Sequence, residues 1–263
     1  MTKIYHYTKL AIALEYILPK MELRTNSLER MNDPKENQPW AFGGKNIDYK
    51  EGYPETYSFE THNDHQYKLG REIKNSSQII CFVKDHPEQG FLNEIMWAHY
   101  SENHKGVCLE IDVDLFLNEN REQLNDFVFE SVSYGQQENP YLDWNEELTK
   151  EQNIKQFVRS THKKLFLQKS VYWEKENEQR LIVFSYESKH LTIKKSLTGI
   201  YFGLQMPYSY KPCIDNFINS DQTMLYNLYY EGNKIKVAAT KFGENRPLIT
   251  RKFADEIDNN LQI

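Results

Sequence analysis

The stretch WEKENEQRLIVF, residues 173–184, decides the fold expected for this chain. Its last four residues form a short apolar run of the kind that a buried strand shows. If this strand extends back to Glu176, then Glu176, Glu178 and Arg180 all point to one face, because side chains alternate along a strand. A surface strand has little use for such a stripe, whereas a cleft that stabilises a developing positive charge needs it. The stretch therefore predicts a sheet with an acidic site at the entrance of one strand.

Further strands and helices are predicted on both sides of this stretch. Alternating and apolar runs predict strands at 3–8, 22–25, 79–83, 106–112, 191–193 and 199–203, and a hairpin over 226–238. Helical spacing predicts helices at 10–18, 92–101, 155–169 and about 208–219. Polar excursions are expected near 43–77 and 135–152. These elements predict an α+β fold: a single domain over residues 1–263 with a mixed, mainly antiparallel sheet flanked by helices.

Composition restricts the class of protein. The chain has 263 residues and a formal net charge of −6, so broad nonspecific binding to nucleic acid is not expected, although a local basic patch could hold a phosphate. The three cysteines show no metal-binding spacing and are expected to be buried thiols in a reducing cytoplasm. No apolar run approaches the roughly 20 residues that cross a bilayer, so we expect a cytoplasmic protein with no membrane partner.

Three other segments contain candidate site residues. His6 lies on the predicted first strand and could bind a sugar hydroxyl, but a lone histidine on a strand is more often structural. Trp97 and Tyr100 share one face of a predicted helix, as an aromatic wall for a flat ring or as part of the core. The turn Asn32–Glu36 is either a helix cap or part of a site. The sequence contains no metal motif and no glycine-rich phosphate loop, so no metal is predicted.

Glu176 and Glu178 are the candidate catalytic residues. Paired carboxylates suit glycosyl chemistry, because a fixed negative charge stabilises an oxocarbenium-like transition state. One carboxylate could hold a ribose hydroxyl and stabilise the cation, while the other polarises the incoming nucleophile. The structural alternative is that one glutamate pairs with Arg180 and the other is solvated.

Four motifs, taken in order, resemble a bacterial family of domains of unknown function. Its pattern is Y-H-Y-T, N-D-P-x-E, M-W-A-x-Y followed by H-x-G, and W-x-x-E-x-E-x-R. The matching residues are Tyr5–Thr8, Asn32–Pro34 with Glu36, Met96–Ala98 with Tyr100, His104 with Gly106, and Trp173, Glu176, Glu178 and Arg180. The similarity runs from about residue 4 to about residue 205, which is most of the chain.

A more distant resemblance is to ADP-ribosyltransferases, especially the DNA-targeting toxins of toxin–antitoxin pairs. It implies an ADP-ribosyltransferase-like fold and NAD as the substrate. It also implies that His6 contacts a ribose of NAD, with Tyr7 beside it in the cofactor-binding set. Glu178, or Glu176, would bind the nicotinamide ribose.

The same resemblance suggests roles for four further residues. Trp97 or Tyr100 would flank the nicotinamide ring. Arg180 or Arg24 would meet the pyrophosphate or orient the carboxylates.

The leading hypothesis is thus an NAD-dependent mono-ADP-ribosyltransferase that acts as a toxin or phage-defence effector on nucleic acid or protein, with an antitoxin as a further partner. The basic helix predicted over 155–169 could present a nucleic-acid acceptor, although most basic helix faces are merely solvated. One alternative is a non-catalytic binding or interaction module of the same fold, in which the motifs hold the fold together. A third hypothesis is a nuclease-type toxin that uses His6 and His104.

Overall fold

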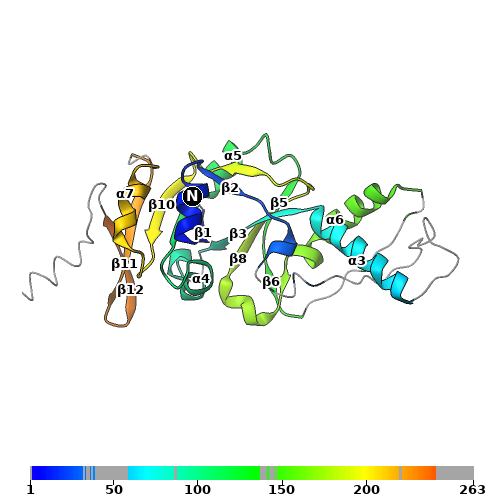
Figure 1. Ribbon diagram of the computed structural model, residues 1–263, viewed down its shortest axis with the longest axis horizontal. Helices are drawn as coiled ribbons and strands as arrows, with labels where there is room; N and C mark the ends of the chain where they lie inside the picture. The colour runs from blue at the N-terminus through cyan, green and yellow to red at the C-terminus, as the bar shows by residue number, and fades with distance from the viewer. Residues whose placement is uncertain are drawn as a thin grey trace, which may run out of the picture. The chain divides into compact units, whose positions relative to one another are not determined.

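The computed structural model describes residues 2–31, 33, 36, 38, 59–85, 88–136, 141, 145, 147–218 and 221–240, with only the backbone described for 59–66 (Figure 1). Contacts between residues divide the chain into two compact units. Unit 1 comprises Met1–Leu23, Phe82–Gln123 and Leu191–Ile263, and unit 2 comprises Arg24–Cys81 and Leu124–His190. A single domain over residues 1–263 stays a prediction.

Eight strands form one mixed sheet. Unit 1 contains β1 (Lys3–Thr8), β4 (Val107–Asp112), β10 (Leu197–Phe202), β11 (Met224–Glu231), β12 (Lys234–Thr240) and the second half of β3 (Gln78–Lys84). Unit 2 contains the first half of β3, β5 (Phe127–Ser131) and β8 (Glu178–Val183). The order is β12-β11-β10-β4-β1-β3-β8-β5. The β10–β11 pair is parallel, and the pairs β1–β3, β1–β4, β4–β10, β11–β12 and β5–β8 are antiparallel, which confirms the predicted α+β fold and sheet.

Helices occur in both units. Unit 1 has α1 (Leu10–Ile12) continued by the π-helix η1 (Ala13–Ile17), then α4 (Glu94–Tyr100), α5 (Val113–Glu119), α7 (Lys211–Asp215) and the 3₁₀ turns η3 (Gly90–Leu92) and η5 (Tyr208–Tyr210). Unit 2 has α3 (Phe59–Asn75), α6 (Lys150–Phe166), η2 (Leu28–Arg30) and η4 (Val171–Glu176). Two short sheets pair β2 (Glu22–Arg24) with β9 (His190–Thr192), and β6 (Ser133–Tyr134) with β7 (Gln168–Lys169).

Aromatic side chains dominate one core of unit 1. Trp97 is fully buried, and the ring of Tyr7 meets it edge to face with 5.0 Å between centroids. The indole Nε1 donates a hydrogen bond to the carbonyl oxygen of Phe91 at 2.7 Å. The ring of Phe91 in turn stacks on Tyr201 at 4.1 Å. These rings bury large apolar areas in edge-to-face and stacked contacts, which accounts for part of the chain's aromatic content of 14%.

The core of unit 2 forms between α3 and α6. Helix α6 begins with a capping box, in which the Thr149 hydroxyl accepts from the Gln152 amide and the Gln152 side chain accepts from the Thr149 amide. Its apolar stripe packs into the same cluster as Leu69 and Ile73 of α3. Lys150 and Glu72 link the two helices through an ion pair of 2.6 Å, and Figure 1 shows both helices in this unit.

The structure differs from the sequence prediction at several points. Helix α5 and strand β5 were not predicted, and α6 begins at Lys150 rather than at 155. Helix α6 ends at Phe166, so Lys169 lies on β7 rather than on a helix. Helix α3 occupies part of the predicted excursion near 43–77; residues 43–58 and parts of the excursion near 135–152 lie outside the described residues. Strand β8 begins at Glu178 and not at Glu176, because Asn177 adopts a left-handed φ of 49° and ends η4 there.

The turn between α4 and β4 has a strained backbone. Glu102, Asn103 and His104 have φ values of 50°, 53° and 67°, a region that costs a non-glycine residue about 1–2 kcal/mol. The His104 amide donates to the Trp97 carbonyl at 3.2 Å, and the two rings stack with 5.6 Å between centroids. A Cβ at Gly203 would lie 2.2 Å from the His104 carbonyl oxygen, so only glycine fits against this turn.

Replacing Glu102 with glycine should leave the free energy of unfolding unchanged or raise it by up to about 1 kcal/mol, because glycine adopts this φ without strain. The control is Asp114→Gly, at an exposed position in the first turn of α5, which should lose about 1 kcal/mol because it adds backbone freedom and removes a carboxylate from the positive end of the helix. Urea denaturation measures both variants. Equal losses would show that the turn stores no strain.

Candidate functional site

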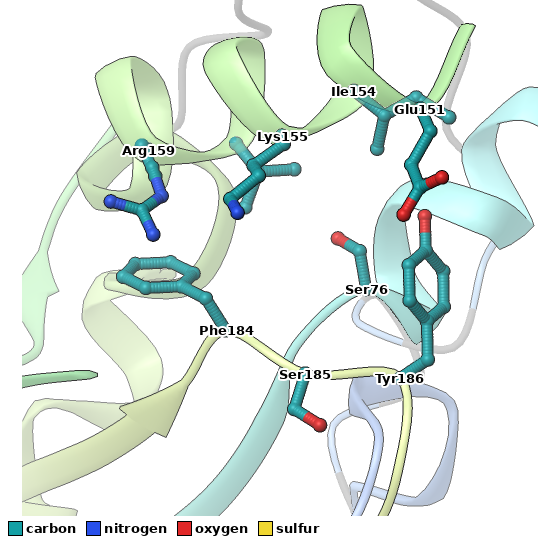
Figure 2. Close-up of a pocket in the computed structure, with 9 residues that line it drawn as sticks. Ser76, Glu151, Ile154, Lys155, Arg159, Phe184, Ser185 and Tyr186 are labelled. Carbon is teal, nitrogen blue, oxygen red and sulfur yellow. The ribbon is translucent and has the colours of Figure 1, made fainter. Parts of the chain in front are cut away.

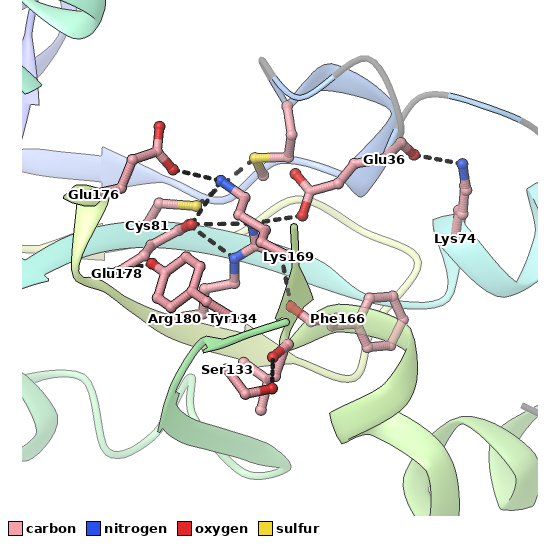
Figure 3. A network of polar contacts seen from close by, with 12 residues as sticks. Glu36, Lys74, Cys81, Ser133, Tyr134, Phe166, Lys169, Glu176, Glu178 and Arg180 are labelled. Atoms are coloured by element: carbon pink, nitrogen blue, oxygen red, sulfur yellow. Dashed lines mark hydrogen bonds and ion pairs between the residues drawn. The ribbon is translucent and has the colours of Figure 1, made fainter. Parts of the chain in front are cut away.

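A network of buried charged side chains lies at the start of β8 in unit 2 (Figure 3). Lys169 Nζ lies 2.7 Å from Glu176 Oε2 and 2.8 Å from Glu178 Oε2. Arg180 Nε donates to Glu178 Oε1 at 2.8 Å, and Arg180 Nη2 lies 2.6 Å from Glu36 Oε1. None of these five residues, called the charge network below, is more than 7% exposed. Three carboxylates therefore share two cations away from bulk water.

Different local structures bring these side chains together. Glu178 and Arg180 are alternate residues of β8, so they share a face as the sequence predicted. Glu176 is the last residue of η4, and the left-handed Asn177 turns the chain from η4 into the strand. Lys169 comes from β7.

Two further bonds tie the network to its surroundings. Arg180 Nη1 donates to the carbonyl oxygen of Phe166 at the end of α6, at 2.6 Å. The backbone amide of Glu178 donates to the Tyr134 hydroxyl of β6 at 2.8 Å. The network is thus anchored to a helix end and to a neighbouring short sheet.

Burial and the charge network together shift the pKa values of two carboxyl groups in opposite directions. Burial alone would raise the pKa of Glu178, but Arg180 and Lys169 lower it from 4.5 to about 2, so this group is ionised at neutral pH. Burial raises the pKa of Glu36 above 4.5, and the attraction of Arg180 and Lys169 does not cancel that rise. Two carboxyl groups bonded to one guanidinium therefore differ in proton affinity, as acid and base groups of active sites do.

The two carboxylate oxygens of Glu36 differ in their hydrogen bonding. Oε2 is buried and has no hydrogen-bond partner in the part of the chain that the structure describes. Lys74 donates to the backbone carbonyls of Glu36, at 2.5 Å, and of Gln38. Burial lowers the pKa of Lys74 to about 8. The sequence allowed two interpretations of the turn Asn32–Glu36, a helix cap or part of a site. The structure shows that this turn supplies one member of the charge network, Glu36.

Sequence reasoning missed two members of the network. Glu36 was named only within a turn that could be a helix cap or part of a site, without a role of its own, and Lys169 was assigned to the basic face of a helix. The signal available for Lys169 was the apolar run Leu165–Leu167, which breaks the amphipathic pattern of a surface helix. No local signal could have joined Glu36 to Arg180, because their contact is made only in the folded chain.

The structure places the predicted site residues in both units. Glu176, Glu178 and Arg180 belong to the charge network of unit 2. Arg24 also belongs to unit 2, but it is exposed and donates from Nε to Ser188 Oγ at 3.1 Å.

The other predicted residues belong to unit 1. His6 and Tyr7 point to opposite faces of β1, since neighbouring strand residues alternate. The His6 ring contacts Phe82 at 5.9 Å, whereas Tyr7 packs on Trp97. Trp97 is a core residue, and the half-buried Tyr100 packs against the same cluster. Within this unit, β1 separates His6 from the aromatic pair that was expected to flank the nicotinamide.

The basic residues of α6 are largely neutralised. Arg159 forms an ion pair with Asp126. Glu130 Oε1 lies 3.3 Å from His162 Nε2, and its Oε2 lies 3.1 Å from Lys163 Nζ. The helix therefore presents less free positive charge to a nucleic acid than its sequence suggested.

A pocket of about 130 Å³ lies beside α6 in unit 2 (Figure 2). Lys155 and Arg159 line one side, with the guanidinium of Arg159 5.8 Å from the Phe184 ring centre, and Glu151 and Tyr186 line another. No member of the charge network lines this pocket. Its volume is below the roughly 300–1,000 Å³ of ordinary ligand pockets, so it does not fit a whole dinucleotide.

The described ranges contain no candidate metal site and no candidate membrane span. No three His, Cys, Asp or Glu side chains there come together as metal ligands. No helix among those residues is both long and apolar enough to cross a bilayer.

The fold and the network define an α+β protein with a buried carboxylate cluster at the entrance of one strand. Residues 96–181 match the model of a family described as a protein of unknown function, DUF2971. The matched region contains Trp97, Tyr100, Lys169 and the stretch from Glu176 to Arg180, but not Glu36. No curated protein and no solved structure matches the chain significantly. The similarity to ADP-ribosyltransferases stays a prediction.

Replacing Arg180 with methionine should lower the free energy of unfolding by about 3–5 kcal/mol, because it leaves buried carboxylates without their cation. The matched control is Arg159→Met in α6, whose side chain is 45% exposed and whose ion pair with Asp126 should contribute less than about 1 kcal/mol. Urea denaturation of both variants tests this. Similar losses would contradict a special role for the charge network.

The stabilising effect of Glu178 should disappear in acid. Its pKa is lower in the folded chain than in the unfolded one, so its contribution is complete above about pH 4.5 and is lost as the pH falls toward 2. The difference in unfolding free energy between wild type and Glu178→Gln should therefore shrink from pH 7 to pH 3. A constant difference over this range would show that Glu178 is not held ionised.

Proposed function

We propose that this protein transfers ADP-ribose from NAD to an acceptor, with Glu178 and Glu176 as the carboxylates of the reaction centre. The observation that supports this is the convergence of three buried carboxylates at the start of β8, with Glu178 held ionised. Buried ion pairs add little stability compared with well-packed apolar side chains, so stability alone does not account for them. Ionisable groups with strongly shifted pKa values concentrate at functional sites.

Glu178 has the central role in this chemistry, and Glu176 lies beside it. Glu178 supplies the fixed negative charge that favours an oxocarbenium-like ribosyl cation. Both of its oxygens are bonded to Lys169 or Arg180, so direct contact with a ribose hydroxyl requires one of these bonds to open. Lys169 links Glu176 to Glu178 and keeps the second carboxylate beside the first.

The acceptor is a nucleic acid or a protein, and the sequence resemblance is what favours a toxin or phage-defence role with an antitoxin partner. The pairing of basic residues on α6 weakens the argument for a nucleic acid. DNA, RNA and protein acceptors are therefore all included in the test.

The second candidate is a non-catalytic binding or interaction module. The observation that favours it is the closure around Glu178, which is 3% exposed and bonded to two cations. In this case the network holds the end of α6, the start of β8 and the segment around Glu36 together, and Trp97 serves only the core of unit 1.

Release of nicotinamide from NAD distinguishes the two candidates. The wild-type protein should release nicotinamide, and Glu178→Gln should do so at least about 100-fold more slowly, because the amide carries no charge to stabilise the ribosyl cation. The control is Glu174→Gln, at an exposed position of the same η4, which should keep the wild-type rate.

The protein must be shown to be folded for either result to count, and circular dichroism at the assay temperature provides this check. If folded wild-type protein releases no more nicotinamide than Glu178→Gln with any of the three acceptors, transfer is excluded and the binding module is the remaining candidate.

A further inference from the structure

We propose that Glu36 accepts the proton of the attacking acceptor group during transfer, a role that rests on the proposed function and adds a catalytic residue to it. Neither the sequence nor the family match assigns Glu36 to the reaction. The two oxygens of the Glu36 carboxyl group have different surroundings.

The position of the Glu36 carboxyl group is fixed by one strong contact. Its Oε1 lies 2.6 Å from Nη2 of Arg180, and the Arg180 side chain is itself held by Glu178 and by the Phe166 carbonyl. The side chain of Glu36 is 7% exposed. A carboxyl group held in this way presents its other oxygen in a defined direction, as a general base must.

The second oxygen of Glu36 is the feature that indicates a ligand. Oε2 is buried and has no hydrogen-bond partner among the described residues, whereas buried polar atoms are nearly always bonded. In a network that only holds the fold such an oxygen should have a partner, because burying it unpaired is unfavourable. A hydroxyl or amine of an acceptor would supply the missing donor.

The charged groups around Glu36 leave it able to exchange a proton. Arg180 of β8 and Lys169 of β7 attract its charge, Glu178 of β8 repels it, and Lys74 of α3 binds the backbone carbonyl of Glu36 rather than its carboxylate. Burial raises the pKa of Glu36, which makes its carboxylate a stronger base than an ordinary glutamate. Glu178, bonded to the same guanidinium, stays ionised throughout.

The step balances with these groups alone. The bond between the nicotinamide nitrogen and ribose C1′ breaks, and its electron pair leaves with nicotinamide, which becomes neutral. A lone pair of the acceptor oxygen or nitrogen forms the new bond to C1′. The proton of that acceptor atom passes to Oε2 of Glu36, whose carboxylate becomes a carboxylic acid and later returns the proton to water.

Rescue with azide tests this role. Azide is an anion that attacks C1′ without giving up a proton, so it needs no general base. Glu36→Gln should lower kcat for nicotinamide release by about 100- to 10,000-fold with KM for NAD unchanged, and azide should restore the rate. Glu178→Gln should not be rescued, because the charge that stabilises the ribosyl cation is still missing. Glu174→Gln should behave as wild type throughout.

The pH dependence of kcat provides a second measurement. Wild type should lose activity in acid as Glu36 becomes protonated, and this acid limb should be absent from azide-supported turnover by Glu36→Gln. If Glu36→Gln does not fold, Glu36→Asp should fold, keep the acid limb at a changed pH and show a lower kcat.

The possible failures are distinguishable. A folded Glu36→Gln that keeps the wild-type kcat, or that azide does not rescue, overturns the role of Glu36 while wild-type activity upholds transfer. A Glu36→Asp with unchanged kcat and acid limb does the same. Wild-type protein that releases no nicotinamide overturns the proposed function and this role with it.

Discussion

The contacts of the Arg180 guanidinium are the interaction on which the structure of unit 2 depends. This fully buried group bonds to Glu178, to Glu36 and to the carbonyl oxygen of Phe166, all within 3.2 Å. It therefore joins the start of β8, the segment around Glu36 and the end of α6. A planar fork with five donors suits this task better than the point charge of a lysine, because several acceptors can be bonded at once. Once the guanidinium is buried, each partner must stay in place, since a lost partner leaves an unpaired charge at low dielectric.

The sequence predicted the part of this network that follows from local geometry. Alternation along β8 placed Glu178 and Arg180 on one face, and the structure confirms that they bond. The two missed members, Glu36 and Lys169, come from segments whose proximity to β8 is a property of the whole fold. The strand boundary was also missed, because a left-handed asparagine at 177 gives no periodic signal. Helix α3 was missed because its sequence also gives a weak periodic signal. Few apolar residues mark its buried face among the described residues, including Leu69 and Ile73 about one turn apart.

Unit 1 shows where a resemblance and elementary geometry disagree. The resemblance grouped His6 and Tyr7 as cofactor-binding residues, yet neighbours on a strand point to opposite faces, and here only Tyr7 reaches the cluster of Trp97. Trp97 shows the core packing that its sequence pattern allowed from the start. The strained turn at Glu102–His104 packs its histidine ring on the same tryptophan. In this chain the segments Met96–Tyr100 and His104–Gly106 are thus joined by direct contact between two rings.

One atom, Oε2 of Glu36, bears most directly on whether the charge network only stabilises the fold or also forms a reaction centre. In a network that only stabilises the fold, every buried carboxylate oxygen should be bonded, and both oxygens of Glu178 meet that condition. Glu36 does not meet it, because Oε2 is buried without a described partner. Burial of that kind is unfavourable unless a ligand or a proton occupies the oxygen for part of the time. The raised pKa of Glu36 beside the lowered pKa of Glu178 is the electrostatic result of the same arrangement. Glu178 is thus bonded at both oxygens, whereas Glu36 has one oxygen without a described partner, and the transfer proposed above would use the two groups differently.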